Sequence, residues 1–357
     1  MDIVSGTVDR GPVPVNVLTG FLGSGKTTLL QRLLRSPRMG RTAVLINEFG
    51  EIGLDHLLVE RVEESVVLLQ SGCICCSIRD DLKSALRGLL GRRDRAEIPA
   101  FDRVVIETTG LADPAPILST LAAEPVVRHH FRLASVITTV DAVNASLHLS
   151  RNPEGIKQLA AADRVVITKT DLAEPARSAA VRGLCERVNP SAEVLDASDA
   201  GIDPDLLLAP RSLDTAAGSP WRPARRVADG RGEQGSDADD GRFSELHRHG
   251  ADVGSLSVVL DEPLDWTAFG IWLSMLLHRY GNDVLRVKGI LRVQEMAAPV
   301  FINAVQHIVH PPQHLERWPT ADHRSRIVFI TRGLDRERLR RSLAAFTNVQ
   351  VSEAANA

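Results

Sequence analysis

The chain has 357 residues, of which 44% are hydrophobic and 24% charged, with a net charge of -3. This composition is ordinary for a soluble protein of two domains. The slightly negative net charge argues against the class of strongly basic nucleic-acid-binding proteins. Only 4% of residues are aromatic, and no apolar run approaches the roughly 20 residues of a membrane helix. Residues 1–12 lack a signal-peptide pattern and are expected to be disordered. We therefore expect a cytoplasmic protein without nucleic-acid or membrane partners.

The first 210 residues alternate short apolar runs with helical patterns. Helices are expected at Lys26–Ser36, Arg79–Leu90 and Ala176–Val188. The apolar runs predict strands at Val13–Leu18, Ala43–Ile46, Val66–Leu69, Arg103–Glu107, Ser135–Val140 and Val165–Thr168. Continuous apolar strands that alternate with helices indicate an α/β domain with a mostly parallel sheet, which we place at residues 13–214.

A phosphate-binding loop follows the first predicted strand. Gly20-Phe-Leu-Gly-Ser-Gly-Lys-Thr27 fits the pattern G-x-x-x-x-G-K-[ST] between a strand and a helix, which is the context of a P-loop. Its glycines let backbone N–H groups turn toward a phosphate, and the helix N-terminus adds partial positive charge. We expect Lys26 to reach the β- and γ-phosphates and the Thr27 hydroxyl to bind Mg²⁺. The nucleotide-binding residues expected here are Gly20, Gly23, Ser24, Gly25, Lys26, Thr27 and Thr28.

Three cysteines form a cluster at Cys73, Cys75 and Cys76. In a reducing compartment such a cluster indicates metal or redox chemistry, and three thiolates suit Zn²⁺ or another thiophilic ion. A fourth ligand is needed, and Glu51 is a candidate because the acidic segment Asn47–Asp55 occupies the place of a switch segment. The alternatives for the cysteines are a thiol redox switch and simple packing. Packing is also the role expected of the isolated Cys185.

Two further loops follow predicted strands. Glu107 ends an apolar strand where an acidic residue would hold or orient Mg²⁺, and Gly110 could bring its N–H to the γ-phosphate. Thr168-Lys-Thr-Asp171 looks like the guanine-reading pattern Asn-Lys-x-Asp, with Thr in place of Asn. The Asp171 carboxylate would accept hydrogen bonds that guanine offers and adenine does not, and Lys169 would cover the base. The expected catalytic residues are Lys26, Thr27 and Glu107.

Large apolar residues become rare after Thr215, so residues 215–243 are expected to form a flexible linker. Beyond it we expect a smaller α+β domain at residues 244–347 and a frayed tail at residues 348–357. Strands are predicted at Ser255–Leu260, Leu285–Val293, Val300–Val309 and Ile327–Thr331, and helices at Leu264–Tyr280 and Leu334–Phe346.

Only one pair of histidines in this region has the spacing of a metal-binding pair on a helix, and the prolines between them would disrupt that helix. We expect surface or linker positions for His247, His249, His307, His310 and His314. A transient metal relay through His247 and His249 is the alternative.

The motifs occur in a characteristic order. After the P-loop come Asn47-Glu-Phe-Gly-Glu51, Gly72-Cys-Ile-Cys-Cys76, Glu107-Thr-Thr-Gly-Leu-Ala-Asp-Pro114 and Thr168–Asp171. Together they resemble the CobW-type GTPases, a family of metal-handling P-loop proteins. The resemblance implies a GTPase domain with an appended C-terminal domain, GTP and Mg²⁺ as ligands, and Zn²⁺ or Co²⁺ bound by Cys73, Cys75, Cys76 and Glu51. Members of the family are thought to deliver metals to client enzymes.

These observations predict a GTP-hydrolysing metallochaperone. It would bind a divalent transition metal, zinc in the first place, and deliver it to a client metalloprotein under GTP control. The alternatives are a metal-independent GTP switch and a thiol redox regulator, while Asp171 argues against an ATP-dependent kinase. The client is not identified by the motifs, and a homo-oligomer is compatible with them.

Overall fold

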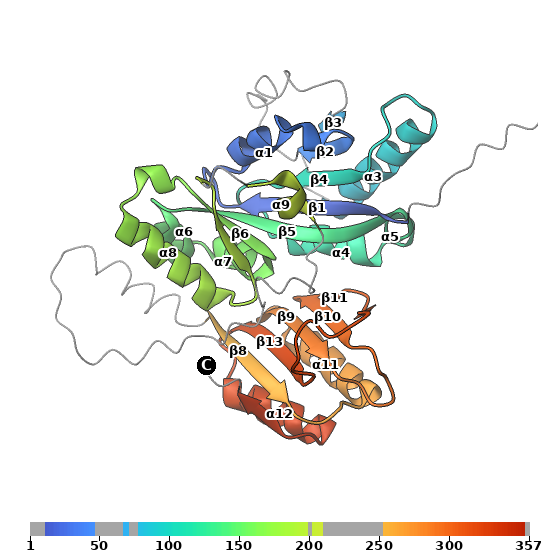
Figure 1. The fold of residues 1–357 in the computed structure, drawn as a ribbon, viewed down its shortest axis with the longest axis vertical. Helices are drawn as coiled ribbons and strands as arrows, with labels where there is room; N and C mark the ends of the chain where they lie inside the picture. The colour runs from blue at the N-terminus through green and yellow to red at the C-terminus, as the bar shows by residue number, and fades with distance from the viewer. Residues whose placement is uncertain (1–10, 47–66, 71–77, 199–201, 210–252, 354–357) are drawn as a thin grey trace, which may run out of the picture.

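The computed structural model describes residues 11–46, 67–70, 78–198, 202–209 and 253–353. These residues form two β-sheets, each with its own helices, and the second sheet lies below the first in Figure 1. None of the helices in this part of the chain has both the length and the apolar character needed to cross a bilayer.

The first sheet is parallel between all its neighbouring strands, in the order β3-β2-β4-β1-β5-β6-β7. Its strands are β1 (Val13–Gly20), β2 (Thr42–Ile46), β3 (Val67–Gln70), β4 (Arg103–Glu107), β5 (Phe131–Asp141), β6 (Arg164–Thr168) and β7 (Glu193–Asp196). The expected α/β architecture with a parallel sheet is therefore confirmed. Its central strands are apolar along most of their length because helices cover both faces.

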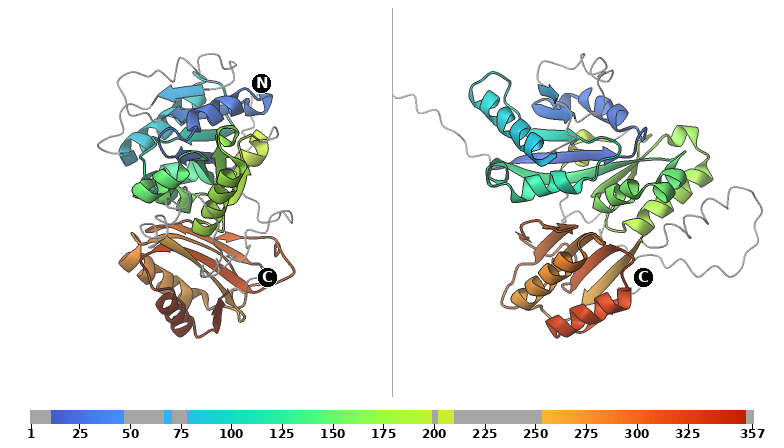
Figure 2. Two further views of the ribbon diagram at one scale, coloured as in Figure 1. Left: turned by 90° about the vertical axis from the view of Figure 1, so that its left-hand side faces the viewer. Right: turned by 180° about the vertical axis from the view of Figure 1, so that it is seen from behind.

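The helices of the first sheet form two layers (Figure 2). One face packs against α3 (Ile78–Asp94), α4 (Ala115–Ala123), α5 (Pro125–His130), α7 (Pro153–Ala161) and α8 (Pro175–Val188), and the other against α1 (Lys26–Leu34) and α9 (Pro204–Leu208). The short α6 (Ala145–Arg151) and the 3₁₀ turns η1 (Pro37–Met39) and η2 (Thr170–Leu172) lie in the connections. Along β6, Val165 and Ile167 pack with α7 and α8, whereas Val166 packs with α1 and α9, as strand alternation requires.

The second sheet is antiparallel, in the order β11-β10-β9-β13-β8-β14, and β12 also pairs with β10. Its strands are β8 (Val253–Leu260), β9 (Val284–Leu291), β10 (Val300–Val305), β11 (Ile308–Val309), β12 (Gln313–His314), β13 (Ser325–Arg332) and β14 (Val351–Glu353). Two helices, α11 (Trp266–Tyr280) and α12 (Arg336–Thr347), cover one face. Each begins after an aspartate, Asp265 or Asp335, whose carboxylate accepts backbone N–H groups of the first turn.

Two expectations about this second part are wrong. Val300–Val309 is a hairpin rather than one strand, because the chain turns at Gln306 and His307, and the turn has none of the glycines that usually mark one. The expected frayed tail begins at Asn348, yet Asn348 ends α12 in a left-handed conformation and β14 then pairs with β8. The expected linker and the residues 1–10 lie outside the described residues.

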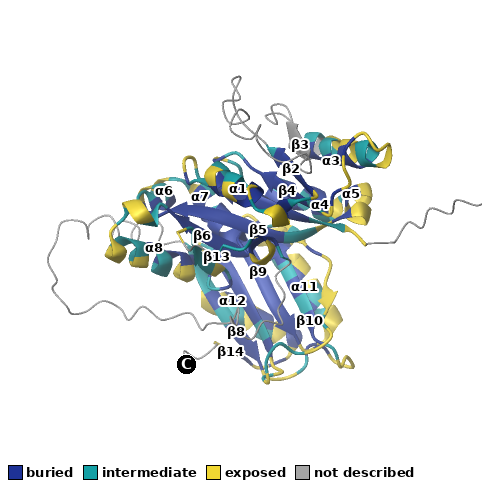
Figure 3. Cartoon of the chain, turned by 45° about the horizontal axis from the view of Figure 1, so that its top comes forward, coloured by how far each residue is buried: buried dark blue, intermediate teal, exposed yellow. Residues whose placement is uncertain are grey.

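The second sheet packs its other face against the first domain. All 8 residues of β9 are buried, because helices cover one side of the strand and α7 and α8 lie on the other. Leu285, Val328 and Ile330 belong to the same apolar cluster as residues of α7 and α8. In Figure 3 much of both sheets is dark blue, which marks buried residues. An apolar cluster of the first domain therefore continues across the interface.

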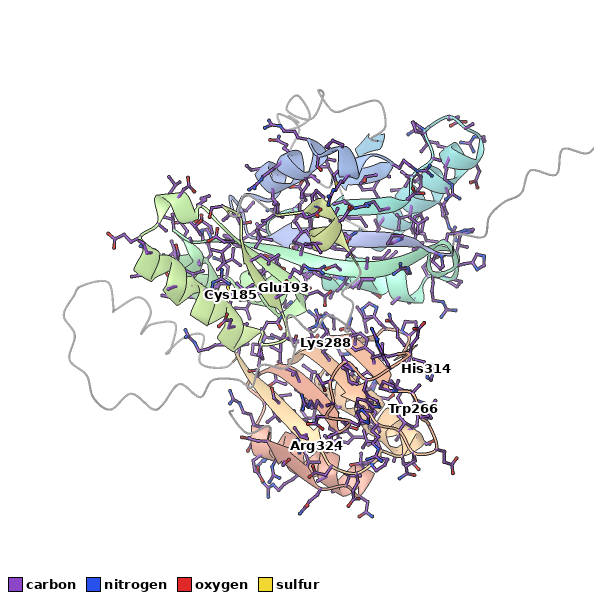
Figure 4. All side chains as sticks on the ribbon, in the orientation of Figure 1. Cys185, Glu193, Trp266, Lys288, His314 and Arg324 are labelled. Atoms are coloured by element: carbon purple, nitrogen blue, oxygen red, sulfur yellow. The ribbon has the colours of Figure 1, made fainter. Side chains whose placement is uncertain are left out.

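A buried ion cluster lies in this interface. Asp163 Oδ1 accepts hydrogen bonds from Arg286 Nη2 at 2.5 Å and Lys288 Nζ at 3.1 Å, and its Oδ2 accepts one from the Val136 N–H at 3.0 Å. Figure 4 labels Lys288 on the side of the second sheet that faces the first. Burial alone would raise the pKa of Asp163, but Arg286 and Lys288 hold it well below its usual range. The carboxylate is therefore ionised and bonded to both domains.

His310 lies beside this cluster, so the surface position expected for it is wrong. Its ring is buried, and burial together with the nearby charge of Arg286 lowers the pKa of His310 to about 4. It is therefore neutral at physiological pH. His307 and His314 are exposed, as expected, and His247 and His249 lie outside the described residues.

We predict that Asp163→Asn destabilises the protein by about 3–5 kcal/mol, because the change removes the carboxylate that two buried cations contact. Urea unfolding followed by circular dichroism measures the loss. Asp102→Asn is the matched control, since Asp102 pairs with Arg41 at 2.6 Å where both side chains are about half exposed. That change should cost no more than about 1 kcal/mol. Equal costs for the two variants would contradict the prediction.

The stability of the wild type and that of Asp163→Asn should depend differently on pH. Because folding lowers the pKa of Asp163, its contribution is complete above the unfolded pKa of about 3.9 and is lost as the pH falls toward the folded value. The wild type should therefore lose stability more steeply than Asp163→Asn between about pH 5 and about pH 3. Parallel stability curves would show that the carboxylate contributes little.

Candidate nucleotide-binding site

The predicted nucleotide-binding residues, all within the described part of the chain, gather at one end of the first sheet. The P-loop follows β1, Glu107 ends β4, and Thr168 ends β6. The register places Leu18 beside Glu107, and Asp141, the last residue of β5, beside Thr168. Parallel sheets bind ligands at this end, where the carboxyl termini of the strands meet.

The P-loop glycines have conformations that other residues rarely adopt. Gly20, Gly23 and Gly25 have φ values of 142°, 68° and 87°. A Cβ atom on Gly20 would lie 2.3 Å from Thr139 Oγ1, so the loop also needs glycine there for space. The Ser24 hydroxyl shares a 2.6 Å hydrogen bond with Thr139 Oγ1 inside the protein, whereas Thr28 is exposed. The loop is thus held against β5 from behind.

Lys26 and Thr27 begin α1 and point toward different partners. Lys26 Nζ donates to Gly20 O at 2.9 Å and Phe21 O at 3.0 Å, and burial lowers the pKa of Lys26 although the charge of Glu107 opposes this. Thr27 Oγ1 donates to Glu107 Oε1 at 2.8 Å. A hydroxyl and a carboxylate side by side are the kind of oxygen ligands that Mg²⁺ accepts, so the donor set fits this ion.

The loop after Glu107 lies against the P-loop. A Cβ atom on Gly110 would be 2.6 Å from Leu22 N, so only glycine fits here. Gln158 Nε2, from α7, donates to Gly110 O at 3.1 Å and to Ala112 O at 2.9 Å. The position of Gly110 next to the P-loop is consistent with the role expected for its N–H.

The same loop reaches the second domain at Asp113. The Asp113 carboxylate accepts hydrogen bonds from Lys157 Nζ at 2.7 Å and from Gln306 Nε2 at 3.1 Å. Gln306 lies in the β10–β11 turn, whereas Lys157 belongs to α7. One aspartate therefore connects the loop of Glu107 to both domains.

The predicted base-reading loop is tied to the P-loop. Thr168 Oγ1 donates to Ser24 O at 2.7 Å, so the threonine that replaces the expected asparagine makes a direct link between the two motifs. Lys169 follows in a left-handed conformation, and its Nζ forms a 2.7 Å ion pair with Asp141 Oδ2. Asp171 is exposed in η2, and Thr170 Oγ1 donates to Asp196 Oδ1 at 2.8 Å.

Sequence reasoning missed Asp141, Thr139, Gln158 and Asp113. Asp141 had a detectable signal, because it ends an apolar strand that precedes the base-reading strand in the same sheet. Thr139 and Gln158 carry no motif, and their roles depend on contacts between distant segments. Asp113 lies within the motif Glu107–Pro114, but its partner Gln306 lies in a different domain.

The predicted metal ligands Cys73, Cys75, Cys76 and Glu51 lie outside the described residues. Within the described part of the chain, no three His, Cys, Asp or Glu side chains gather closely enough to hold a metal ion. Cys185, labelled in Figure 4, is buried in α8, and burial raises the pKa of its thiol to about 12. It is a packing residue, as the sequence predicts.

Known proteins match both parts of the chain. Residues 14–196 match the family model described as CobW/HypB/UreG, nucleotide-binding domain, and residues 253–347 match the cobalamin synthesis protein cobW C-terminal domain. The zinc chaperone YjiA of Escherichia coli (strain K12) is 32% identical over 333 residues, which are 93% of this chain and 98% of that protein. The zinc-regulated GTPase metalloprotein activator 1 of Schizosaccharomyces pombe is 35% identical over 199 residues, which are 54% of this chain and 47% of that protein.

A solved structure matches the whole arrangement. The Zn(II)-bound YjiA GTPase from E. coli aligns with a TM-score of 0.67 and 28% identity, covering 94% of this chain and 99% of that one. The likeness thus includes both the parallel sheet and the antiparallel sheet.

We predict that Thr168→Val weakens binding of guanosine diphosphate several-fold and lowers the free energy of unfolding by about 1–2 kcal/mol. Valine keeps the branched shape but removes the hydroxyl that Ser24 O accepts. Thr168→Ser keeps the hydroxyl and should bind nearly as the wild type does. Calorimetric titration measures the affinities, and identical affinities of Val and Ser variants would contradict the role of this bond.

Proposed function

The chain belongs to the CobW/HypB/UreG nucleotide-binding family, and on that premise we propose that it is a GTP-hydrolysing metallochaperone for zinc. The observation that carries the proposal is the meeting of the P-loop, Glu107 and the Thr168–Asp171 loop at one end of the parallel sheet. Three motifs distant in sequence thereby form one site for a nucleoside triphosphate. The choice of zinc and of a chaperone activity rests on the names of the relatives.

The phosphate end of the site uses Lys26, Thr27, Glu107 and Gly110. Lys26 would exchange the neutral carbonyls of Gly20 and Phe21 for the β- and γ-phosphates, with the N–H of Gly110 near the γ-phosphate. Thr27 and Glu107 would hold Mg²⁺, which neutralises phosphate charge when bound. Glu107 would orient either this ion or the attacking water. Gly20, Gly23, Ser24, Gly25 and Thr28 complete the phosphate end.

The base end uses Asp171 and Lys169. Asp171 is the exposed middle residue of η2, where its carboxylate can accept hydrogen bonds from N1–H and the 2-amino group of guanine. Adenine would leave that carboxylate without donors, which is costly in a closed site. We therefore propose GTP rather than ATP as the substrate.

The zinc cargo is proposed to bind Cys73, Cys75 and Cys76, with Glu51 as the fourth ligand. The described chain on either side supports this. Ile46 and Gln70, the last residues of β2 and β3, are register partners, and Ile46 also pairs with Glu107. Both ligand segments therefore leave the sheet at the nucleotide end. The same thiolate set could take Co²⁺.

The nucleotide would control this cargo. GTP would favour the assembled zinc site, and hydrolysis would weaken it so that zinc passes to a client metalloprotein. Because such coupling is reciprocal, zinc must then tighten GTP binding by the same factor. The thiolates need a reducing compartment, so we propose a cytoplasmic protein, either alone or as a homo-oligomer.

We expect zinc affinity to depend on the nucleotide. Chelator competition should give tight binding with a nonhydrolysable GTP analogue and weaker binding with GDP, because the site is proposed to loosen after hydrolysis. Cys75→Ala should remove this tight binding, whereas Cys185→Ala should keep it, since Cys185 is a buried packing residue of α8 and is not a proposed ligand. Zinc affinity that ignores both nucleotide and Cys75 would favour a metal-independent switch or a redox regulator.

Lys26→Ala should abolish measurable GTP binding and hydrolysis, because it removes the only P-loop side chain expected to contact the β- and γ-phosphates. Calorimetry and phosphate release measure the two effects. Lys83→Ala is the matched control and should retain both activities, because it removes a lysine of α3 that pairs with Glu124, away from the P-loop. An unchanged GTP affinity in Lys26→Ala would overturn the nucleotide assignment.

A further inference from the structure

Asp141 is a buried carboxylate beside the base-reading loop Thr168–Asp171. It ends β5, and its side chain is 1% exposed. Its Oδ1 accepts the backbone N–H groups of Val143 at 2.7 Å and Asn144 at 3.3 Å. Its Oδ2 accepts hydrogen bonds from Asn144 Nδ2 at 2.9 Å and from Lys169 Nζ at 2.7 Å. The carboxylate thus organises the start of α6 with one oxygen and bonds Lys169 with the other.

The backbone around Lys169 is fixed independently of this ion pair. Lys169 has a φ of 57° and a ψ of 31°, a left-handed conformation that is unfavourable for a residue other than glycine. The preceding Thr168 holds it there, because its carbonyl accepts the Ala142 N–H at 2.9 Å and its hydroxyl bonds Ser24 O. The backbone direction of Lys169 is therefore set, and what remains to be fixed is its long side chain.

A lysine side chain has four rotatable bonds and loses much freedom when it is ordered. Lys169 is 34% exposed, so its ammonium could otherwise move into solvent or toward the phosphates. The bond to a buried carboxylate removes that freedom before any ligand arrives. Preorganisation of this kind increases affinity because binding no longer has to order the group.

We propose that Asp141 is a positioning residue that holds the Lys169 side chain across the base plane and thereby strengthens guanine-nucleotide binding. The inference rests on the proposed function, since it assumes that a base lies at Lys169. Asp141 itself touches no part of the nucleotide in this proposal. It acts through Lys169.

The charges nearby are compatible with this role. Burial alone would raise the pKa of Asp141, but the hydrogen bonds from Lys169, Asn144 and Val143 outweigh it and lower the pKa. The neighbouring His148, whose ring centroid lies 4.5 Å from that of Phe21, has its pKa lowered by burial. At neutral pH the carboxylate is therefore charged and His148 is not, so the ammonium of Lys169 is the cation bonded to Asp141.

Asp141→Asn separates positioning from the structural role of this residue. The amide oxygen can still accept the Val143 and Asn144 N–H groups, whereas the charge that holds Lys169 is lost. We expect GDP affinity to fall about tenfold and pyrophosphate affinity to stay within about twofold, because pyrophosphate contacts the P-loop alone. Asp102 forms a surface ion pair with Arg41 at the opposite end of the sheet, so Asp102→Asn should change neither affinity.

A double-mutant cycle with Lys169→Met tests whether the effect passes through Lys169. Methionine keeps an apolar stem over the base but has no ammonium to anchor. In that background Asp141→Asn should change GDP affinity by less than about twofold. A full tenfold loss in both backgrounds would overturn the proposal, and so would a parallel loss of pyrophosphate affinity.

Different results would refute the proposed function and the positioning role of Asp141. A wild type that does not bind GDP refutes the proposed function. A wild type that binds GDP while Asp141→Asn binds equally well refutes the positioning role alone. If Asp141→Asn does not fold, Lys169→Met decides by itself, since wild-type GDP affinity in that variant would show that no anchor is needed.

Discussion

The site depends on the parallel register of the first sheet. Parallel strands deliver their carboxyl ends to one edge, and the register between β1 and β4 and between β5 and β6 puts the P-loop, Glu107, Asp141 and Thr168 there together. Hydrogen bonds then join the motifs in pairs, Thr27 to Glu107 and Thr168 to Ser24. A nucleotide would therefore meet a surface whose parts are already bonded to one another, which reduces the ordering that binding must supply.

Besides the apolar contact, two polar contacts of different character join the second domain to the first. Asp163 bonds Arg286 and Lys288 where both cations are almost completely buried, so loss of any one of the three would leave a buried charge uncompensated. Asp113 bonds Gln306 and Lys157 with about a quarter of its side chain exposed, and it follows the loop that begins at Glu107. The first contact fixes the domains together. The second puts the antiparallel domain against the loop that, in the proposed mechanism, lies beside the γ-phosphate.

Features that depend on residues close together in the chain could be predicted from the sequence, whereas features that depend on distant residues could not. The P-loop, the strand that ends at Glu107 and the loop after β6 are specified by neighbouring residues, so their spacing was sufficient. Arg286 and Lys288 alternate with valine on β9, which from sequence alone is typical of a solvent-exposed face. Both are buried because Asp163 lies opposite in the other domain. The burial of His310 and the pairing of β14 were missed for the same reason, since each depends on residues far away in the chain.

The two lysines of the site differ in the strength of their internal partners. Lys26 bonds two neutral carbonyls in a setting where burial lowers its pKa, so a phosphate would be a better partner and would restore the preference for the charged form. Lys169 bonds a buried carboxylate, and a guanine base offers only neutral acceptors, which are weaker partners for an ammonium than that carboxylate. In the proposed mechanism, nucleotide binding would therefore recruit Lys26 and leave Lys169 where it is. The phosphates would gain the Lys26 ammonium, while the base would meet a side chain that is already ordered.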